Sequence, residues 1–453
     1  MNREAILFIR IAPWLERKYA HPREAIFPFS IGYAATQLLK QGMDVKVIDT
    51  VVEPINAKKI INYILIENPN FVVVDSCCST EHIARIIASE VKSRQKGVYF
   101  VFFGQSNIEN YDVCIAGELE PALPPIIENY RSLSPPKKIN RVNEFVENLD
   151  MLPHIDYSLF KFNRYSKKSV CAPILGKKRW GFLLSTRGCP FNCTFCSSVL
   201  RNSLGKNYRI HSASWVIDEI KRLRKDYRIN AISFEDDCFT YDKEHVEQIC
   251  EGLIKNRINL YWTARTRADL LDTYLLKRMK EAGCFALSIG VESGSDRILK
   301  LLNKNQDREK ILEVIKLMKK QKIMPLLYFI IGNPTETCPE MEETFQLAKK
   351  LGPSMIQVHY FTPYLDSEIS RSLDRNGLSL INISHYDSLR YNLSAIPDNI
   401  LKGALKKFYL RYFLSLEYFY IYLRYRLPYV IFDFNEIRLI LDTLRFLLKG
   451  KLS

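Results

Sequence analysis

Short apolar runs alternate with amphipathic stretches through most of the chain. In the first 130 residues, runs rich in Val, Ile and Phe predict buried strands at Ala5–Arg10, Asp44–Asp49, Phe71–Asp75 and Val98–Gly104, with a weaker one at Val113–Ala116. Helical periodicity lies between them, near Ser30–Gln41, Ala57–Glu67 and Glu81–Lys92. This alternation predicts parallel strands joined by right-handed crossovers. Residues 1–130 are therefore expected to form a doubly wound sheet that binds any ligand at the carboxyl ends of its strands.

The same alternation resumes after a segment of different composition. Residues 131–178 are rich in Pro, Asn, Ser and Lys, which predicts a linker that crosses the surface. Beyond it, strands are expected at Gly181–Thr186, Ala231–Phe234, Leu260–Thr263, Phe285–Gly290, Pro325–Ile331 and Met355–Phe361. Helices are expected around Trp215–Lys225, Lys243–Lys255, Ala268–Glu281, Arg308–Gln321 and Glu340–Lys350. Six βα units cannot close the usual eight-stranded barrel, so residues 179–375 are expected to form a partial (β/α)6 barrel, with chemistry at the strand ends.

The last segment, residues 376–453, is expected to be a helical, basic and aromatic C-terminal region. Phe408, Tyr412, Leu416 and Phe419 recur at helical spacing, which is typical of a helix face packed against a barrel. The same mixture also suits an interfacial membrane helix or an RNA surface. The predicted fold class is thus α/β: a doubly wound, flavodoxin-like sheet, a partial (β/α)6 barrel, and a helical tail.

Charge and composition narrow the function only slightly. The chain carries 65 Lys and Arg against 50 Asp and Glu, a net charge of +15. This excess suits nucleic acid, anionic lipid or phosphorylated substrates, and it equally suits a plain basic surface. No apolar run reaches the roughly 18 residues of a spanning helix. Because Met1–Arg10 lacks a small-residue cleavage site, we expect no secretory signal and a cytoplasmic protein.

The cysteines carry the strongest chemical signal. The chain has 11, and three of them, Cys189, Cys193 and Cys196, lie within eight residues. An odd count with this crowding favours a metal centre over a disulfide framework. Three thiolates on one loop can bind three irons of a 4Fe–4S cluster and leave the fourth iron open, as a catalytic metal site requires. The alternative is a structural zinc site, with its fourth ligand from Cys171, Cys238 or Cys284.

The cysteine loop, C-x3-C-x2-C with an aromatic residue before the last cysteine, resembles the radical S-adenosylmethionine (SAM) superfamily. The resemblance spans about residues 176–365 and extends to motifs at later strand ends, Phe234–Thr240, Trp262–Arg267, Gly290–Ser295 and Ile331–Glu336. It implies an enzyme whose open iron is chelated by the amino and carboxylate groups of SAM. One electron, from a reductant such as flavodoxin or ferredoxin, then cleaves the sulfonium C–S bond.

The resemblance also implies how the polar ends of SAM are bound. Glu235, Asp236 and Asp237 stand where the family places acceptors for its ammonium group, and adjacent carboxylates repel unless a cation lies among them. The alternative for this acidic run is a solvated loop or a helix cap. Either Arg265 or Arg267 would pair with the SAM carboxylate, although Arg267 has an alternative partner in Asp269.

Further residues are implied for the nucleoside part of SAM. Glu292 and Ser293 would bind the ribose hydroxyls, and Phe195 would lie against the adenine. Gly290 and Gly332 would allow the backbone to approach closely.

Residues 1–130 resemble the cobalamin-binding domain that precedes many radical SAM domains. The resemblance rests on Pro28–Ala35, Asp75–Thr80, Phe103–Gly104 and Ala116–Glu118. It implies a corrin over the strand ends, with its amides or nucleotide tail bound by Ser76, Ser79, Thr80 and Gly104. The family's D-x-H-x-x-G motif is absent at Ile11–Trp14, which implies cobalamin without a protein His ligand. Because Gln105 replaces an expected second Gly, the alternative is a vestigial domain that only positions substrate.

These features together predict a cytoplasmic, oxygen-sensitive, cobalamin-dependent radical SAM methyltransferase or a related transferase. Its substrate is expected to be a small or lipid-like molecule, with peripheral membrane contact through the tail left open and nucleic acid not expected. A radical SAM tRNA-modifying enzyme is the first alternative, but the adjacent Cys77 and Cys78 are poorly spaced for a second cluster. The other alternative is a non-catalytic cobalamin or metal sensor, against which the intact three-cysteine loop argues.

Overall fold

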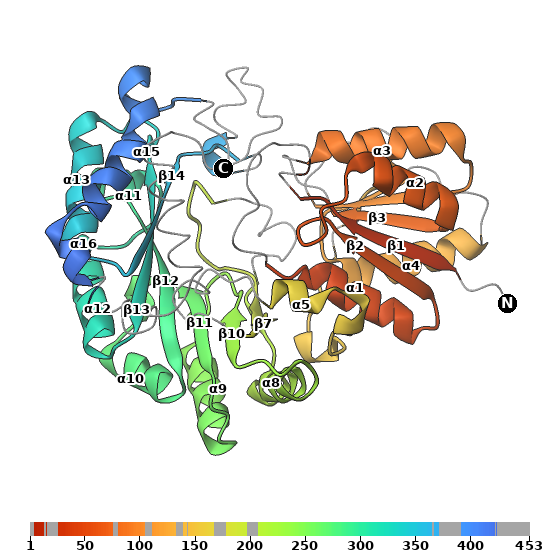
Figure 1. Ribbon diagram of the computed structural model, residues 1–453, viewed down its shortest axis with the longest axis horizontal. Coiled ribbons are helices and arrows are strands. Elements are labelled where there is room, and N and C mark those ends of the chain that lie inside the picture. The colour runs from red at the N-terminus through yellow and green to blue at the C-terminus, as the bar shows by residue number, and fades with distance from the viewer. Residues whose placement is uncertain are drawn as a thin grey trace.

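The chain folds around two six-stranded parallel sheets, each covered by helices (Figure 1). The computed structural model describes residues 4–12, 15, 26–75, 80–104, 111–132, 139–142, 144–166, 178–196, 207–364, 367–370, 391–421 and 423. The predicted α/β class, with a doubly wound sheet followed by a partial barrel, is confirmed.

The first sheet has the strand order β2-β1-β3-β4-β5-β6, with every pair parallel. Its strands are β1 (Ala5–Arg10), β2 (Asp44–Asp49), β3 (Phe71–Asp75), β4 (Tyr99–Phe103), β5 (Val113–Ile115) and β6 (Ile139–Val142). Helices α1 (Phe29–Lys40) and α4 (Leu119–Ser132) cover one face, and α2 (Ala57–Glu67) and α3 (Glu81–Arg94) cover the other (Figure 1). The chain reverses direction across the sheet between β1 and β3, so a ligand crevice is expected at their carboxyl ends.

The second sheet has the order β14-β13-β12-β11-β10-β7, again with every pair parallel. Its strands are β7 (Trp180–Leu183), β10 (Ala231–Phe234), β11 (Tyr261–Thr266), β12 (Cys284–Glu292), β13 (Met324–Ile331) and β14 (Met355–Tyr360). The outer helices are α8 (Ala213–Tyr227), α9 (Lys243–Lys255), α10 (Thr273–Glu281), α11 (Asp296–Leu301), α12 (Arg308–Lys320) and α13 (Cys338–Leu351). The six strands form the expected open partial barrel.

Side-chain caps explain where several barrel helices begin. Ser212 accepts a hydrogen bond from the backbone N–H of Trp215 at the start of α8. Asp242 and Asp272 do the same at the starts of α9 and α10, at 3.0 and 2.8 Å. Each such cap is worth about 1 kcal/mol, so these positions define the helix starts and keep the strand-to-helix loops short.

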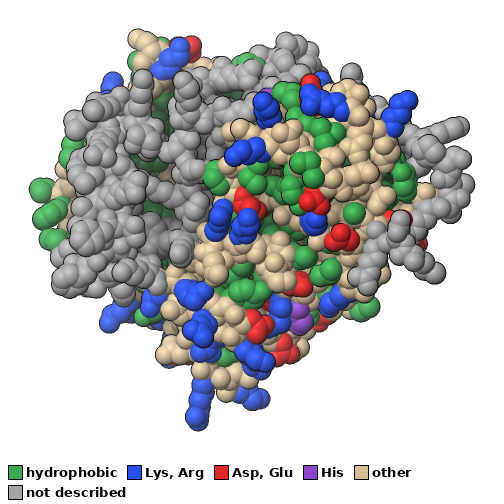
Figure 2. Space-filling view, turned by 45° about the vertical axis from the view of Figure 1, so that its right-hand side comes forward, with side chains coloured by type: hydrophobic (Ala, Val, Ile, Leu, Met, Phe, Trp, Pro, Cys, Tyr) green, Lys and Arg blue, Asp and Glu red, His purple; other side chains and the backbone are tan. Residues whose placement is uncertain are grey.

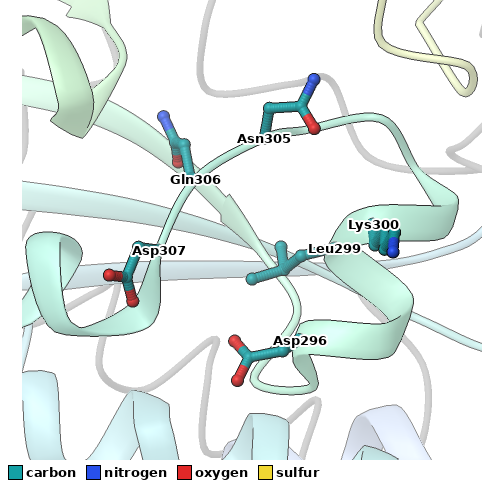
Figure 3. Close-up of a pocket in the computed structure, with 6 residues that line it drawn as sticks. All are labelled: Asp296, Leu299, Lys300, Asn305, Gln306 and Asp307. Carbon is teal, nitrogen blue, oxygen red and sulfur yellow. The ribbon is translucent and has the colours of Figure 1, made fainter.

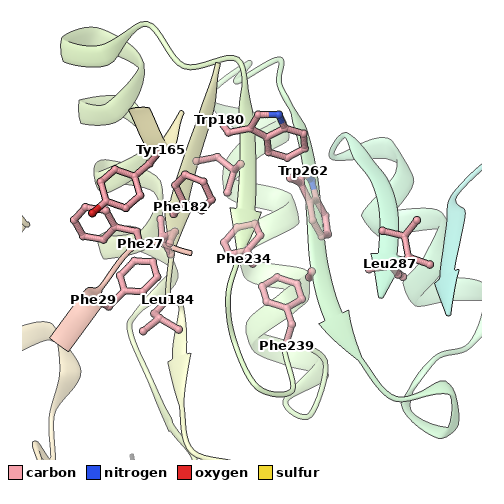
Figure 4. Packing of buried hydrophobic residues seen from close by; sticks show 14 of the residues in the cluster. Phe27, Phe29, Tyr165, Trp180, Phe182, Leu184, Phe234, Phe239, Trp262 and Leu287 are labelled. Atoms are coloured by element: carbon pink, nitrogen blue, oxygen red, sulfur yellow. The ribbon is translucent and has the colours of Figure 1, made fainter. Parts of the chain in front are cut away.

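The described part of the predicted linker, residues 144–166, packs into the core and does not cross the surface as its composition predicts. It contains η1 (Leu149–Met151), η2 (Tyr157–Leu159) and α5 (Phe162–Tyr165). Tyr157 and Tyr165 are buried against Phe27, with ring centroids 5.0 and 5.3 Å away, in a core that continues into the barrel (Figure 4). Composition misled here because it does not show that Tyr157 and Phe162 also contact Tyr227 at the end of α8.

Hydrogen bonds attach this segment to both sheets. The Tyr157 hydroxyl donates to Glu219 on α8 at 3.1 Å, and the Tyr165 hydroxyl donates to Asp49 at the end of β2. The backbone N–H of Asp156 donates to Thr36 on α1 at 2.8 Å. The described residues 144–166 therefore form a packed bridge between the two sheets.

Of the four tail residues predicted to pack against the barrel, only the first two do so. Helix α15 (Asp398–Phe413) buries Phe408 and Tyr412 against the barrel, and the Tyr412 hydroxyl donates to Pro353 O at 2.8 Å. In the next helix, α16 (Leu416–Ile421), Leu416 and Phe419 are exposed. Among the described residues, no helix is long and apolar enough to span a membrane. Basic side chains outnumber acidic ones on the face drawn in Figure 2, as the net charge of +15 would suggest.

Candidate functional site

The three cysteines lie on a loop that leaves a short hairpin beside β7. Strand β8 (Thr186–Arg187) pairs antiparallel with β9 (Arg209–Ile210), and Gly188 follows with φ of 91°. That left-handed conformation favours glycine and turns the chain into the loop. Cys193 is buried, Cys189 and Cys196 are partly exposed, and none of the three forms a disulfide.

The loop is attached to the barrel through its own backbone. The N–H of Thr194 donates to Leu302 O at 3.0 Å, and its hydroxyl donates to Leu301 O at 3.1 Å. The side-chain amide of Asn303 donates to Asn192 O at 2.7 Å. The residues that follow α11 thus fix the position of Cys193.

The sequence allows two kinds of metal centre at these cysteines, a structural zinc site and a 4Fe–4S cluster. Within the described ranges, no three His, Cys, Asp or Glu side chains converge on the position of one ion. A cubane does not require such convergence, because each cysteine binds a different iron. Three cysteines on one loop, none in a disulfide and two of them partly exposed, therefore fit a 4Fe–4S cluster with one open corner.

Two carboxylates after β10 each have one buried oxygen without a hydrogen-bond partner. Asp236 is fully buried; one oxygen accepts from the Ser185 hydroxyl at 2.8 Å, but Oδ2 has no hydrogen-bond partner. Asp237 Oδ2 likewise has none. Burial raises the pKa of each carboxyl to about 6. Buried acceptors without donors are costly, so this pair fits a cationic ligand such as the SAM ammonium group.

The first member of the acidic run behaves differently. Glu235 accepts from Ser233 at 2.6 Å and pairs with Arg265, whose Nη1 lies 2.5 Å from its Oε2. The structure therefore joins the two groups expected to bind opposite ends of SAM. Arg267 makes the alternative contact, a two-point pair with Asp269 at 2.9 and 3.0 Å.

The end of β12 holds a buried ion pair. Glu292 has a positive φ of 67°, and its Oε1 accepts from Lys304 Nζ at 2.9 Å. A Cβ on Gly290 would lie 2.1 Å from that oxygen, so glycine is required for the pair to form there. Ser293 is fully buried, 3.2 Å from the Thr344 hydroxyl. The roles of Glu292 and Ser293 toward ribose stay predictions.

Two further predicted positions lie near this strand end. Gly332 has φ of 74°, and its N–H donates to Glu336 at 2.6 Å. Burial raises the pKa of Glu336 to about 7. Phe195 packs beside Ile298 and Phe361 in a small apolar cluster. An apolar platform of this kind suits the adenine face, which is also still a prediction.

Only part of the site predicted on the first sheet lies among the described residues. Gly104 follows β4 with φ of 103°, where a side chain would be strained, and Thr80 is fully buried at the start of α3. Ser76, Ser79 and Trp14 lie outside the described residues. A corrin at this edge of the sheet stays a prediction.

A buried charge network connects this edge to the cysteine loop, and sequence reasoning missed it. Arg187, the residue before Gly188, pairs with Glu118 at 3.0 Å and with Glu120 at 2.7 Å; all three are at most 2% exposed. Arg209 pairs with Glu118 from the other strand of the hairpin, at 3.0 Å. The sequence does contain a signal for this network: Glu118 and Glu120 stand just after the fifth strand, and Arg187 stands just before the cysteine loop.

The structure also has a surface pocket of about 370 Å³ beside α11 (Figure 3). It is lined by Asp296, Leu299, Lys300, Asn305, Gln306 and Asp307. None of the predicted site residues lines it, so the candidate site is at the strand ends and the cysteine loop.

Comparison with known sequences identifies one domain of the chain. Residues 183–348 match the family described as the radical SAM superfamily, and the match includes the cysteine loop and most of the barrel. The chain therefore contains a radical SAM domain. Radical SAM enzymes use a 4Fe–4S cluster and SAM, act on small molecules and take electrons from external reductants, so these expectations are confirmed at the level of the family.

Relatives of this radical SAM protein include methyltransferases by name. An uncharacterized methyltransferase of Pyrococcus horikoshii is 29% identical over 417 residues, which cover 85% of this chain and 88% of the relative. The cytidylyl-2-hydroxyethylphosphonate methyltransferase of Streptomyces wedmorensis is 28% identical over 271 residues, which cover 57% of this chain and 50% of the relative. The chain thus spans about half of the second relative.

Solved structures support the two-part radical SAM fold. The radical SAM methyltransferase TsrM of Kitasatospora setae, solved with cobalamin and a 4Fe–4S cluster, superposes with a TM-score of 0.63 at 14% identity. The superposition covers 83% of this chain and 78% of TsrM. The cobalamin-dependent radical enzyme OxsB gives 0.62 at 19% identity, covering 83% of this chain and 56% of OxsB. The predicted order, a cobalamin-binding-like fold before a radical SAM barrel, is confirmed.

Proposed function

We propose that this radical SAM enzyme transfers a methyl group to a small molecule and uses cobalamin in the reaction. The observation that carries the proposal is the buried network of Arg187 with Glu118 and Glu120. It holds the carboxyl edge of the first sheet against the start of the cysteine loop. A ligand at that edge would face the loop, as methyl transfer requires reacting groups within about 3–3.5 Å.

The residues of the chain have separable parts in this proposal. Cys189, Cys193 and Cys196 would hold the cluster, and the Oδ2 atoms of Asp236 and Asp237, which accept no hydrogen bond, would bind the ammonium group of SAM. Arg265, positioned by Glu235, offers a planar fork for the SAM carboxylate. When bound, the cluster and SAM supply one-electron C–S cleavage, and cobalamin supplies a methyl carrier.

The barrel contributes shielding as well as binding groups. Asp236 and Ser185 are fully buried beneath the loop, and Arg267 closes over the ring of Phe191 at 3.8 Å. Such packing keeps water away from a reactive intermediate and strengthens the charge pairing at the site. We propose a flavodoxin or ferredoxin as the one-electron donor. The names of the two relatives and of TsrM support methyl transfer as the reaction.

The first experiment tests the cobalamin site. Purified, anaerobically reconstituted protein is expected to bind hydroxocobalamin, measured by cobalt content and corrin absorbance. Gly104→Trp should abolish uptake, because a large side chain would occupy the ligand edge. Gly97→Trp is the matched control: it lies before the same strand, has a φ of 98°, and has open space around it. Equal uptake by both variants, or no uptake by the wild type, would overturn the cobalamin proposal.

The second experiment tests the reaction class. With a strong reductant, SAM should yield 5′-deoxyadenosine from radical cleavage and S-adenosylhomocysteine from methyl loss, both measured by mass spectrometry. Only the second product should depend on cobalamin. If S-adenosylhomocysteine never forms with cobalamin bound, the chain is a radical SAM enzyme of another reaction class.

A further inference from the structure

One arginine contacts a cysteine of the loop directly. Arg267 follows β11, and its side chain is 7% exposed. Its Nη1 lies 3.8 Å from the Sγ of Cys193, which is hydrogen-bond distance for a sulfur acceptor. Cys193 is the buried member of the three cysteines, so this contact is shielded from water.

The guanidinium group is held in place from three other sides. Asp269 accepts from Nε and Nη2 at 3.0 and 2.9 Å, and Lys304 O accepts from Nη2 at 2.7 Å. The ring of Phe191, from the cysteine loop itself, lies 3.8 Å from the guanidinium carbon. The N–H that points at Cys193 therefore has a fixed direction, which a mobile side chain would not provide.

The supports of Arg267 are also supports of the loop. The residues after α11 bind the loop backbone through Leu302 and Asn303, and one residue later Lys304 binds Arg267. Gln306 donates to Asp269 at 2.9 Å and completes the frame. One rigid segment thus positions both the sulfur and its donor.

We propose that Arg267 sets the reduction potential of the cluster through its N–H···S bond to Cys193. The inference rests on the proposed cluster and deepens it. Reduction adds one electron to the cluster and moves no proton, so the thiolate ligands become more electron-rich. A fixed donor and a cationic group beside one thiolate stabilise that reduced form more than the oxidised form. Arg267 therefore makes it easier for an external one-electron reductant to reduce the cluster.

The test is a redox titration of the iron-loaded protein without SAM, followed by electron paramagnetic resonance. Arg267→Met removes the donor and the charge but keeps an unbranched side chain against Phe191. The bond is present in both oxidation states, so only the difference in its strength between them shifts the midpoint. At the wild-type midpoint, the ratio of reduced to oxidised cluster should fall severalfold, and a tenfold fall corresponds to about 59 mV for one electron.

A second variant should change the potential in the opposite direction. Asp269→Asn keeps Arg267 but removes the carboxylate that offsets its charge, so the midpoint should rise. Arg278→Gln is the control, because that arginine pairs with Glu281 on α10. It should keep the wild-type midpoint. If Arg267→Met binds no cluster, Arg267→Lys, which keeps the charge without the planar fork, should give an intermediate midpoint.

The outcomes separate the two levels of the argument. Full iron content with unchanged midpoints in the Arg267 and Asp269 variants would show that Arg267 is only a structural support, and the inference would be wrong. Wild-type protein that never holds about four irons would instead refute the cluster itself. Parallel downward shifts in both variants would also contradict the inference, because they would indicate general loosening of the loop.

Discussion

Replacing Arg187 with Met should destabilise the protein more than any surface substitution. Arg187 is 1% exposed and pairs with two buried carboxylates, Glu118 and Glu120. Arg209 still compensates Glu118 in the variant, but Glu120 loses its pair. Breaking a buried pair by removing one partner costs about 3–5 kcal/mol. For a domain of this size, that corresponds to a fall in the unfolding temperature of roughly 6–20 °C.

The assay is anaerobic thermal unfolding of the wild type and variants, with a double variant to identify the cause. Adding Glu120→Gln to Arg187→Met removes the stranded charge and should recover part of the loss. Arg278→Met, which breaks an exposed pair on α10, should cost less than about 1 kcal/mol. If Arg187→Met lowers the unfolding temperature no more than Arg278→Met does, the network does not stabilise the contact between the two sheets.

The pH dependence gives a second check on the same variant. Burial already raises the pKa of Glu120 in the wild type above its ordinary 4.5. A raised carboxyl pKa means that ionisation costs stability, and the cost grows as pH rises above the unfolded value. Without Arg187 the folded pKa should rise further. The stability difference between variant and wild type should therefore widen as pH rises above the raised folded pKa of Glu120 in the wild type, and a constant difference there would contradict the assignment to Glu120.

Three further outcomes are expected. Asp237→Asn should weaken SAM binding about ten- to a hundredfold in equilibrium dialysis while iron content stays unchanged, because one charge-assisted bond is lost; unchanged affinity would reassign the site. Gly290→Ala should displace the Glu292–Lys304 pair and weaken SAM binding about tenfold, with little change in unfolding temperature because side-chain ends yield more easily than backbone; wild-type binding would exclude that pair from the site. Glu336→Gln should gain stability relative to the wild type as pH rises from 5 to 8, because Glu336, with a pKa of about 7, ionises at a cost that the amide avoids; parallel denaturation profiles would refute this.

The elements that the sequence predicts well are those that one buried pattern specifies. Val, Ile and Phe runs such as Phe71–Asp75 and Tyr99–Phe103 are buried on both faces and appear as central parallel strands. The spacing of Cys189, Cys193 and Cys196 similarly defines a loop without reference to anything distant. Local spacing was sufficient for both features because the residues that define each of them are close together in the sequence.

The features that the sequence could not predict are pairings between distant residues. Arg187 and Glu120 are 67 residues apart, and nothing in either neighbourhood specifies the other. Arg265 was expected to pair with a ligand, and in this structure its Nη1 also pairs with Glu235. The stripe of Phe408 and Leu416 looks uniform in sequence, but only its first part reaches the barrel. Periodicity shows which face is apolar and does not show how far the partner surface extends.

The packed bridge of residues 144–166 has a consequence for engineering chimeric enzymes. Cutting the chain at residue 130, where the first sheet runs out of predicted strands, would remove Tyr157 and Tyr165 from beside Phe27 and leave Asp49 without the Tyr165 hydroxyl. A first sheet transplanted that way would expose Phe27, which Tyr157 and Tyr165 cover in this structure. A workable exchange of this module between enzymes would place the junction after Ser166, so that the bridge moves with the sheet whose core it completes.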